Sequence, residues 1–262
     1  MRSGNPALSD KVFSNAAREA ATGQSMTLEG TAIKTGFLLA ILCAGAVFTW
    51  VQTDALAPAL TTEAVRRAGE LHPPQFAYGY FIAGMIGGLI ASLATMFVPR
   101  WSPITAPIYA GFEGLALGAI SAIVEYRYPG IALQAVGLTF GTLAALLLAY
   151  STRLVRATEH FKMGIMAATG AIGLVYLVSF VLSFFGIRIP LIHESGLIGI
   201  GFSVFVVIIA SLNLVLDFDF IETGTRRGAP KYMEWYGGFG LLMTLVWLYI
   251  EVLRLLSKLR ER

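Results

Sequence analysis

Residues 197–220 read LIGIGFSVFVVIIASLNLVLDFDF, an apolar run with no charged side chain before Asp217. About 20 consecutive apolar residues are enough for an α-helix to cross the hydrocarbon core of a bilayer. Six further apolar segments are bounded by charges, Pro or Gly. The sequence therefore predicts an all-α integral membrane protein with seven transmembrane helices. The other six segments lie at about residues 33–52, 77–98, 104–124, 130–150, 163–186 and 235–256.

The composition supports a membrane protein and excludes several soluble classes. Hydrophobic residues make up 56% of the chain and charged residues 13%, whereas a soluble domain carries about 25% charged residues. The mean hydropathy is +0.71. The net charge of +3 does not indicate a nucleic-acid partner, because the basic residues are scattered and do not alternate with aromatic residues. The lipid bilayer is the expected partner.

Three parts of the chain are expected: an N-terminal cytoplasmic arm at 1–32, a membrane domain at 33–256 and a basic C-terminal tail at 257–262. The arm lacks the charged-then-apolar layout of a cleaved signal peptide, so we expect it to be retained. The loop from Gln52 to Gln75 contains a short amphipathic run that would allow an interfacial helix. The single cysteine, Cys43, is interpreted as a packing residue.

Small residues are frequent in the second and third segments, for example at Gly84, Gly88, Gly114 and Gly118. Small side chains let transmembrane helices approach closely, so they indicate tight packing. A hinge or a pore-lining face is the alternative interpretation.

The distribution of Lys and Arg favours a cytoplasmic N-terminus, because basic residues are enriched in cytoplasmic loops. Eleven of them then lie inside and four outside, but seven full crossings would place the basic C-terminal tail outside, against this tendency. The inside set comprises Arg2, Lys11, Arg18, Lys34, Arg100, Arg153, Arg156, Lys162, Arg226, Arg227 and Lys231, and the outside set Arg66, Arg67, Arg127 and Arg188.

Four ionisable residues in the apolar segments are candidates for function, because a charge inside a bilayer is costly unless it is paired or hydrated. Glu113 lies in the middle of the third segment, and Asp217 lies near the end of the sixth. Glu251 and Arg254 lie near the end of the seventh. A protonated carboxyl group bonded to a neighbouring helix is the structural alternative for Glu113.

Helix geometry assigns Asp217 and Asp219 to different surroundings. Residues two apart on a helix point in widely different directions, so both carboxylates cannot face one site. Asp217 shares a face with Asn213 and is assigned inward, which leaves Asp219 at the membrane boundary. Glu251 and Arg254 are three apart on one face and could simply neutralise each other.

Enzyme chemistry is not indicated. The chain has no HExxH zinc motif, no GxSxG nucleophile elbow and no GxxxxGK[ST] phosphate loop. The three histidines, His72, His160 and His193, fall in expected loops. Lys34 is the one lysine expected inside an apolar segment, so a retinal Schiff base is unsupported. No cofactor is expected.

Several stretches resemble the Bax inhibitor-1 family of membrane proteins, in its bacterial YccA-type branch. They occur in the same order over about residues 33–256. The stretches are FEGLALG at 112–118, LQAVGLTF at 133–140, LDFDFI at 216–221 and LYIEVLRLL at 248–256.

The resemblance implies two groups of three helices around a central seventh helix. It also implies a pH-sensitive calcium leak channel, in which an aspartate of the sixth helix pairs with one of the seventh. Asp217 matches the first aspartate, but Thr244 occupies the position of the second. Arg254 matches an arginine that in the family binds a glutamate of the second helix, and the second segment here has no acidic residue.

Two functions are therefore expected as alternatives. The first is a leak pathway for a cation, with Ca²⁺ or H⁺ as the ion, gated by protonation of Asp217 and Glu113, which also serve as the metal ligands. Glu113 is expected to replace the missing acidic partner, next to Arg254 or Asp217. The second is a regulator without transport that binds a membrane protease or other membrane proteins. Either protein would reside in the inner membrane of a bacterium.

Overall fold

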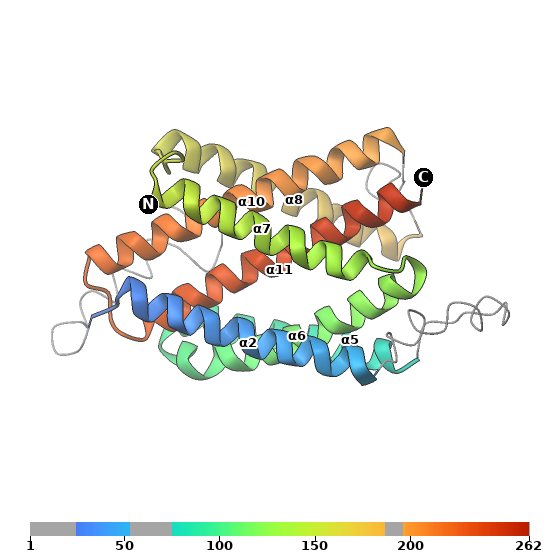
Figure 1. Cartoon of the computed structure of the whole chain (residues 1–262), viewed down its shortest axis with the longest axis horizontal. Coiled ribbons are helices and arrows are strands. Elements are labelled where there is room, and N and C mark those ends of the chain that lie inside the picture. The colour runs from blue at the N-terminus through green and yellow to red at the C-terminus, as the bar shows by residue number, and fades with distance from the viewer. Residues whose placement is uncertain (1–24, 53–74, 187–195, 262) are drawn as a thin grey trace, which may run out of the picture. The chain divides into compact units, whose positions relative to one another are not determined.

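The structure, a computed structural model, describes residues 25–52, 75–186 and 196–261. Seven α-helices and the short 3-10 helix η2 (Pro99–Trp101) form within these ranges, with no strand (Figure 1). All seven are long and apolar enough to cross a membrane, so the expected all-α membrane fold is confirmed. The N-terminal arm up to residue 24 and the loop at 53–74 lie outside the described residues. The helices are α2 (Leu28–Gln52), α5 (Gln75–Phe97), α6 (Ser102–Arg127), α7 (Ile131–Ser151), α8 (Glu159–Phe184), α10 (Leu197–Arg226) and α11 (Met233–Arg260).

Several helices extend beyond the apolar segments that indicate them, among them α2, α8 and α11. Helix α2 begins at Leu28 because the Thr27 hydroxyl accepts a hydrogen bond from the Gly30 amide, 3.0 Å away. Helix α8 begins at Glu159 because the Thr158 hydroxyl accepts one from the Phe161 amide. Helix α11 continues to Arg260, with basic residues in its last turn, where the helix dipole favours cations.

One compact unit comprises Gln24–Gln134 and Pro230–Leu242, and therefore contains α2, α5, α6 and the start of α11. Helix α6 packs against both α2 and α5 (Figure 1). A Cβ atom built on Gly114 would lie 2.3 Å from the Leu42 carbonyl oxygen, and one on Gly118 would lie 2.4 Å from that of Ala46. Such distances are too short for a side chain, so the packing interpretation of these glycines is confirmed.

A second compact unit contains α7 from Ala135 onward, α8, α10 and α11 from Met243 onward. Helices α8 and α10 pack together through a buried apolar cluster, to which α11 adds Trp247. The expected two groups of three helices are thus present, and the seventh helix contributes to both. The cluster consists of Ile165, Ile172, Val206, Ile209 and Leu216.

Polar residues are buried along α11 at regular intervals. Thr244, Glu251 and Lys258 are each at most 5% exposed and are spaced seven residues apart. Seven residues are close to two helical turns, so the three positions lie on one face of the helix. This face belongs to the second unit and carries two of its candidate functional residues, Thr244 and Glu251.

We predict that Gly114→Ala destabilises the protein by about 1–3 kcal/mol, because the new methyl group would collide with the α2 backbone. Gly111→Ala is the matched control on the same helix, since its Cβ would meet nothing closer than 3.8 Å. Thermal unfolding of the two purified variants measures the difference. Equal melting temperatures would show that the close contact between α2 and α6 is not required.

Candidate functional site

The predicted site residues divide between the two units. Glu113 belongs to the unit that contains α2, α5 and α6. The others belong to the unit that contains α8 and α10, and they lie on two of its helices. They are Asn213, Asp217 and Asp219 on α10, and Thr244, Glu251 and Arg254 on α11.

Asp217 is fully buried, with 0% of its surface exposed, in agreement with its inward assignment. Asn213, one turn earlier on α10, is 2% exposed. Its side-chain amide donates to the Thr169 hydroxyl of α8 and to the Ile209 carbonyl, both at 2.8 Å. Asn213 therefore ties α10 to α8 beside the buried aspartate, and Thr244 is buried on α11 of the same unit.

Asp219 binds a buried lysine. Its side chain is 23% exposed, and its carboxylate lies 2.8 Å from the ammonium of Lys162, which is 6% exposed. Lys162 was expected in a loop, but the Thr158 cap places it in the first turn of α8. The expectation that Lys34 is the one lysine inside an apolar helix is therefore wrong. The cap signal, a threonine just before the helix, was present in the sequence.

Glu251, Arg254 and Tyr176 form a cluster between α11 and α8. An Arg254 nitrogen donates to the Glu251 carboxylate at 3.2 Å and to the Tyr176 hydroxyl at 2.6 Å. The Tyr176 hydroxyl lies 3.0 Å and 3.1 Å from the two Glu251 oxygens, and the guanidinium lies 5.0 Å from the tyrosine ring. The neutralising pair expected from the spacing is present. Sequence reasoning missed Tyr176, because a tyrosine in an apolar segment looks like any packing residue.

Lys258 is a second buried lysine, in the last turn of α11. Its ammonium donates to the Gly199 carbonyl at 3.0 Å and to the Ser203 hydroxyl at 2.9 Å, both on α10. Sequence reasoning placed Lys258 in a basic tail after the last apolar segment. Its position seven residues after Glu251 was the signal that the polar face continues.

Glu113 lies half-buried on α6, against α5. A Cβ atom on Gly88 would lie 2.9 Å from a Glu113 carboxylate oxygen, so the absence of a side chain at Gly88 makes room for this group. The hypothesis that Glu113 lies next to Arg254 or Asp217 joins residues of different units and stays a prediction.

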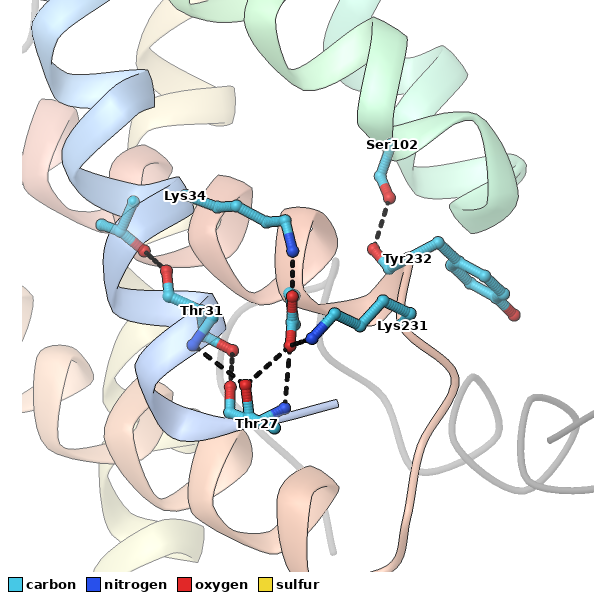
Figure 2. A network of polar contacts seen from close by, with 9 residues as sticks. Thr27, Thr31, Lys34, Ser102, Lys231 and Tyr232 are labelled. Carbon is cyan, nitrogen blue, oxygen red and sulfur yellow. Dashed lines mark hydrogen bonds and ion pairs between the residues drawn. The ribbon is translucent and has the colours of Figure 1, made fainter. Parts of the chain in front are cut away.

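A network at the start of α11 was not anticipated from the sequence. Figure 2 shows Lys34, Lys231 and Thr27 turned toward a common point, which is the carboxylate of Glu234. Glu234 is 0% exposed and accepts hydrogen bonds at 2.9 Å from the amide and the hydroxyl of Thr27. The Lys231 ammonium is 2.8 Å away, and that of Lys34 is in direct contact. The network therefore fastens the start of α2 to the start of α11.

The Glu234 network depends on a small residue of α2. A Cβ atom on Gly30 would lie within 2.6 Å of both Glu234 carboxylate oxygens. Nearby, Ser102 at the start of α6 donates to the Tyr232 carbonyl at 3.0 Å (Figure 2). Sequence reasoning missed Glu234 because it lies just before the last apolar segment, where an acidic residue is normally solvated.

Within the described ranges, no group of three or more His, Cys, Asp or Glu residues could hold a metal ion. Asp219 of α10 contacts a lysine side chain, and Glu251 of α11 contacts arginine and tyrosine side chains. The oxygens that these residues present belong to carboxylate, hydroxyl and carbonyl groups, which are the ligands that hard cations prefer.

Comparison with known proteins identifies the family. The sequence model of the family described as Bax inhibitor 1 like matches residues 5–261. The chain belongs to the Bax inhibitor-1-like family. No curated protein and no solved structure matches it.

Family membership confirms the resemblance seen in the four short motifs. Together with the seven apolar helices, it shows that this Bax inhibitor-1-like protein is a multi-pass membrane protein. The match extends beyond the membrane helices to residue 5, so it includes most of the N-terminal arm, which the four motifs left outside.

We predict that Glu234→Gln destabilises the protein by about 1–3 kcal/mol, since it removes the charge that accepts hydrogen bonds from Thr27 and binds Lys34 and Lys231. Glu29→Gln is the control, because Glu29 is an exposed acid in the first turn of α2. Thermal unfolding in the same detergent compares the two variants. If both variants melt at the wild-type temperature, the network contributes nothing to stability.

We predict that Tyr176→Phe and Glu251→Gln have non-additive effects, because one hydrogen-bonded cluster contains both side chains. Each substitution should lower the free energy of unfolding. The loss in the double variant should be smaller than the sum of the two single losses by at least about 0.5 kcal/mol. Chemical unfolding of the four proteins in the cycle gives this coupling energy. Additive effects would show that the two groups act separately.

Proposed function

We propose that this Bax inhibitor-1-like protein is a leak pathway for cations, with Ca²⁺ as the leading candidate. The single observation that carries the proposal is the complete burial of Asp217 in a helix of membrane-spanning length. A carboxylate in such a position is costly to keep and is a functional candidate for that reason. The proposal places the protein in the inner membrane of a bacterium, with its N-terminus in the cytoplasm.

The chemistry around Asp217 supports a cation rather than an anion or an organic substrate. Asn213 and Thr169 place an amide and a hydroxyl group one turn away, and hard cations prefer oxygen ligands. Conduction requires binding that is weak enough for the ion to leave. The small number of acidic residues near one another is compatible with a leak pathway of that kind.

Protonation of single carboxylates is the gating mechanism that these residues support best. Thr244, at the position of the family's second aspartate, cannot ionise, so Asp217 does not share a proton with a neighbour on that site. An ionised carboxylate attracts a cation and a protonated one does not. Flux through this protein should therefore increase as the pH rises and Asp217 and Glu113 lose their protons.

We predict that Asp217→Asn lowers calcium uptake into proteoliposomes by at least tenfold and weakens the pH dependence of the remaining flux between pH 6 and 8, because Glu113 then remains. Glu113→Gln should lower the flux and weaken its pH dependence, because one carboxylate then remains. Glu159→Gln is the control, since the Glu159 side chain is 72% exposed. A calcium-sensitive dye inside the vesicles measures the uptake.

Two outcomes would contradict the proposal. Unchanged flux and pH dependence in both Asp217→Asn and Glu113→Gln would exclude these carboxylates from the pathway. A wild-type protein that transports no cation at any pH would favour the alternative function, a regulator that binds a membrane protease or another membrane protein.

A further inference from the structure

The ammonium group of Lys258 has an unusual environment. Lys258 is 5% exposed although it lies only two residues before the end of α11. A lysine near a helix end normally extends its charge to water. This one turns instead toward α10, where the Gly199 carbonyl and the Ser203 hydroxyl accept its hydrogen bonds.

Lys258 and Arg254 both interact with the carboxylate of Glu251. Glu251 is the acidic group within the electrostatic range of Lys258, and Arg254 already binds that carboxylate at 3.2 Å. The part of the chain that the structure describes thus places one carboxylate near two cations. Burial of an extra cation is unfavourable unless polar oxygens replace its water.

The two oxygens that bind Lys258 are suited to a monovalent metal cation. Backbone carbonyl groups replace the hydration shell of such ions in membrane proteins. Gly199 and Ser203 are one turn apart on α10, so the helix holds their oxygens on the same face. Ser203 is 1% exposed, and Tyr176 packs edge-on against the neighbouring Phe202 at 6.2 Å between ring centroids. The oxygens therefore belong to a packed and ordered part of the unit.

We propose that the oxygens of Gly199 and Ser203, in the field of the Glu251 carboxylate, form a monovalent-cation site that the Lys258 ammonium occupies as a tethered cation. An ammonium is a compact, strongly hydrated point charge and can take the place of K⁺ or Na⁺ among oxygen ligands. While Lys258 is in place, no soluble cation can bind there. This site is separate from Asp217, and the inference does not depend on the leak function.

A simpler explanation is that Lys258 only anchors α11 to α10. The last turn of a helix favours a cation, and an anchored lysine would stabilise the unit in the same way. The two explanations differ in what happens once the ammonium is removed. An empty cation site would accept a soluble ion of suitable size, whereas a lost anchor would not respond to the identity of the salt.

The test uses the full-length protein and Lys258→Met, which keeps an unbranched side chain, one heavy atom shorter than lysine, and removes the ammonium group. Melting temperatures are measured in KCl, NaCl and N-methylglucamine chloride at equal ionic strength. The wild type should melt at the same temperature in all three salts. In the organic salt, Lys258→Met should have a lower melting temperature than the wild type. The melting temperature of this variant should rise by about 3 °C or more when K⁺ or Na⁺ is present at ten times the dissociation constant of that ion.

The double variant Ser203→Ala/Lys258→Met is the matched control and should lose the response to K⁺ and Na⁺. A Lys258→Met protein that melts at one temperature in all three salts overturns the proposal, and so does a response that survives in the double variant. If Lys258→Met does not fold, Lys258→Gln takes its place. Failure of both variants to fold even in KCl and NaCl also overturns the proposal, because soluble cations would then not replace the ammonium.

Discussion

The hydrocarbon core of a bilayer offers no water to the backbone, and the rest of this structure follows from that constraint. Each crossing must satisfy its own amide and carbonyl groups, and an α-helix does so within one segment. Hydrophobic attraction between helices is absent in lipid, so helices associate through close packing and interhelical hydrogen bonds. The glycines of α6 allow the close packing, and polar groups on α8, α10 and α11 form the interhelical hydrogen bonds.

The same constraint explains which features the sequence could reveal. Apolar length alone indicated the seven helices, because no other regular structure fits those segments. Glu251 and Arg254 were paired correctly, since their spacing on one helix fixes their distance. Partners from other helices, such as Tyr176 for Glu251, could not be derived, because spacing within a segment says nothing about which face meets which neighbour.

The ends of helices were predicted least well, and the charged networks lie near these ends. Lys162, Glu234 and Lys258 lie just outside the expected apolar segments, because a charge at the edge of an apolar run normally marks where solvent begins. The structure buries all three. Each charge has oxygen or nitrogen partners on another helix, which makes its burial tolerable. Hydropathy averages cannot detect this, because they treat every charge as solvated.

Under the proposed leak function, Thr244, which stands where the family resemblance implies a second aspartate, changes the kind of pH response to expect. Two carboxylates that share a proton titrate as a pair with two separated apparent pKa values, and such a pair can switch sharply between two arrangements. Asp217 has no acidic neighbour at that position, so its protonation adds or removes one charge without breaking an acid–acid contact. For the proposed leak pathway, the expected consequence is a graded dependence of flux on pH, in place of a switch between closed and open states. Other charges of its unit, such as those of the Tyr176 cluster and Lys258, lie on other turns and have partners of their own.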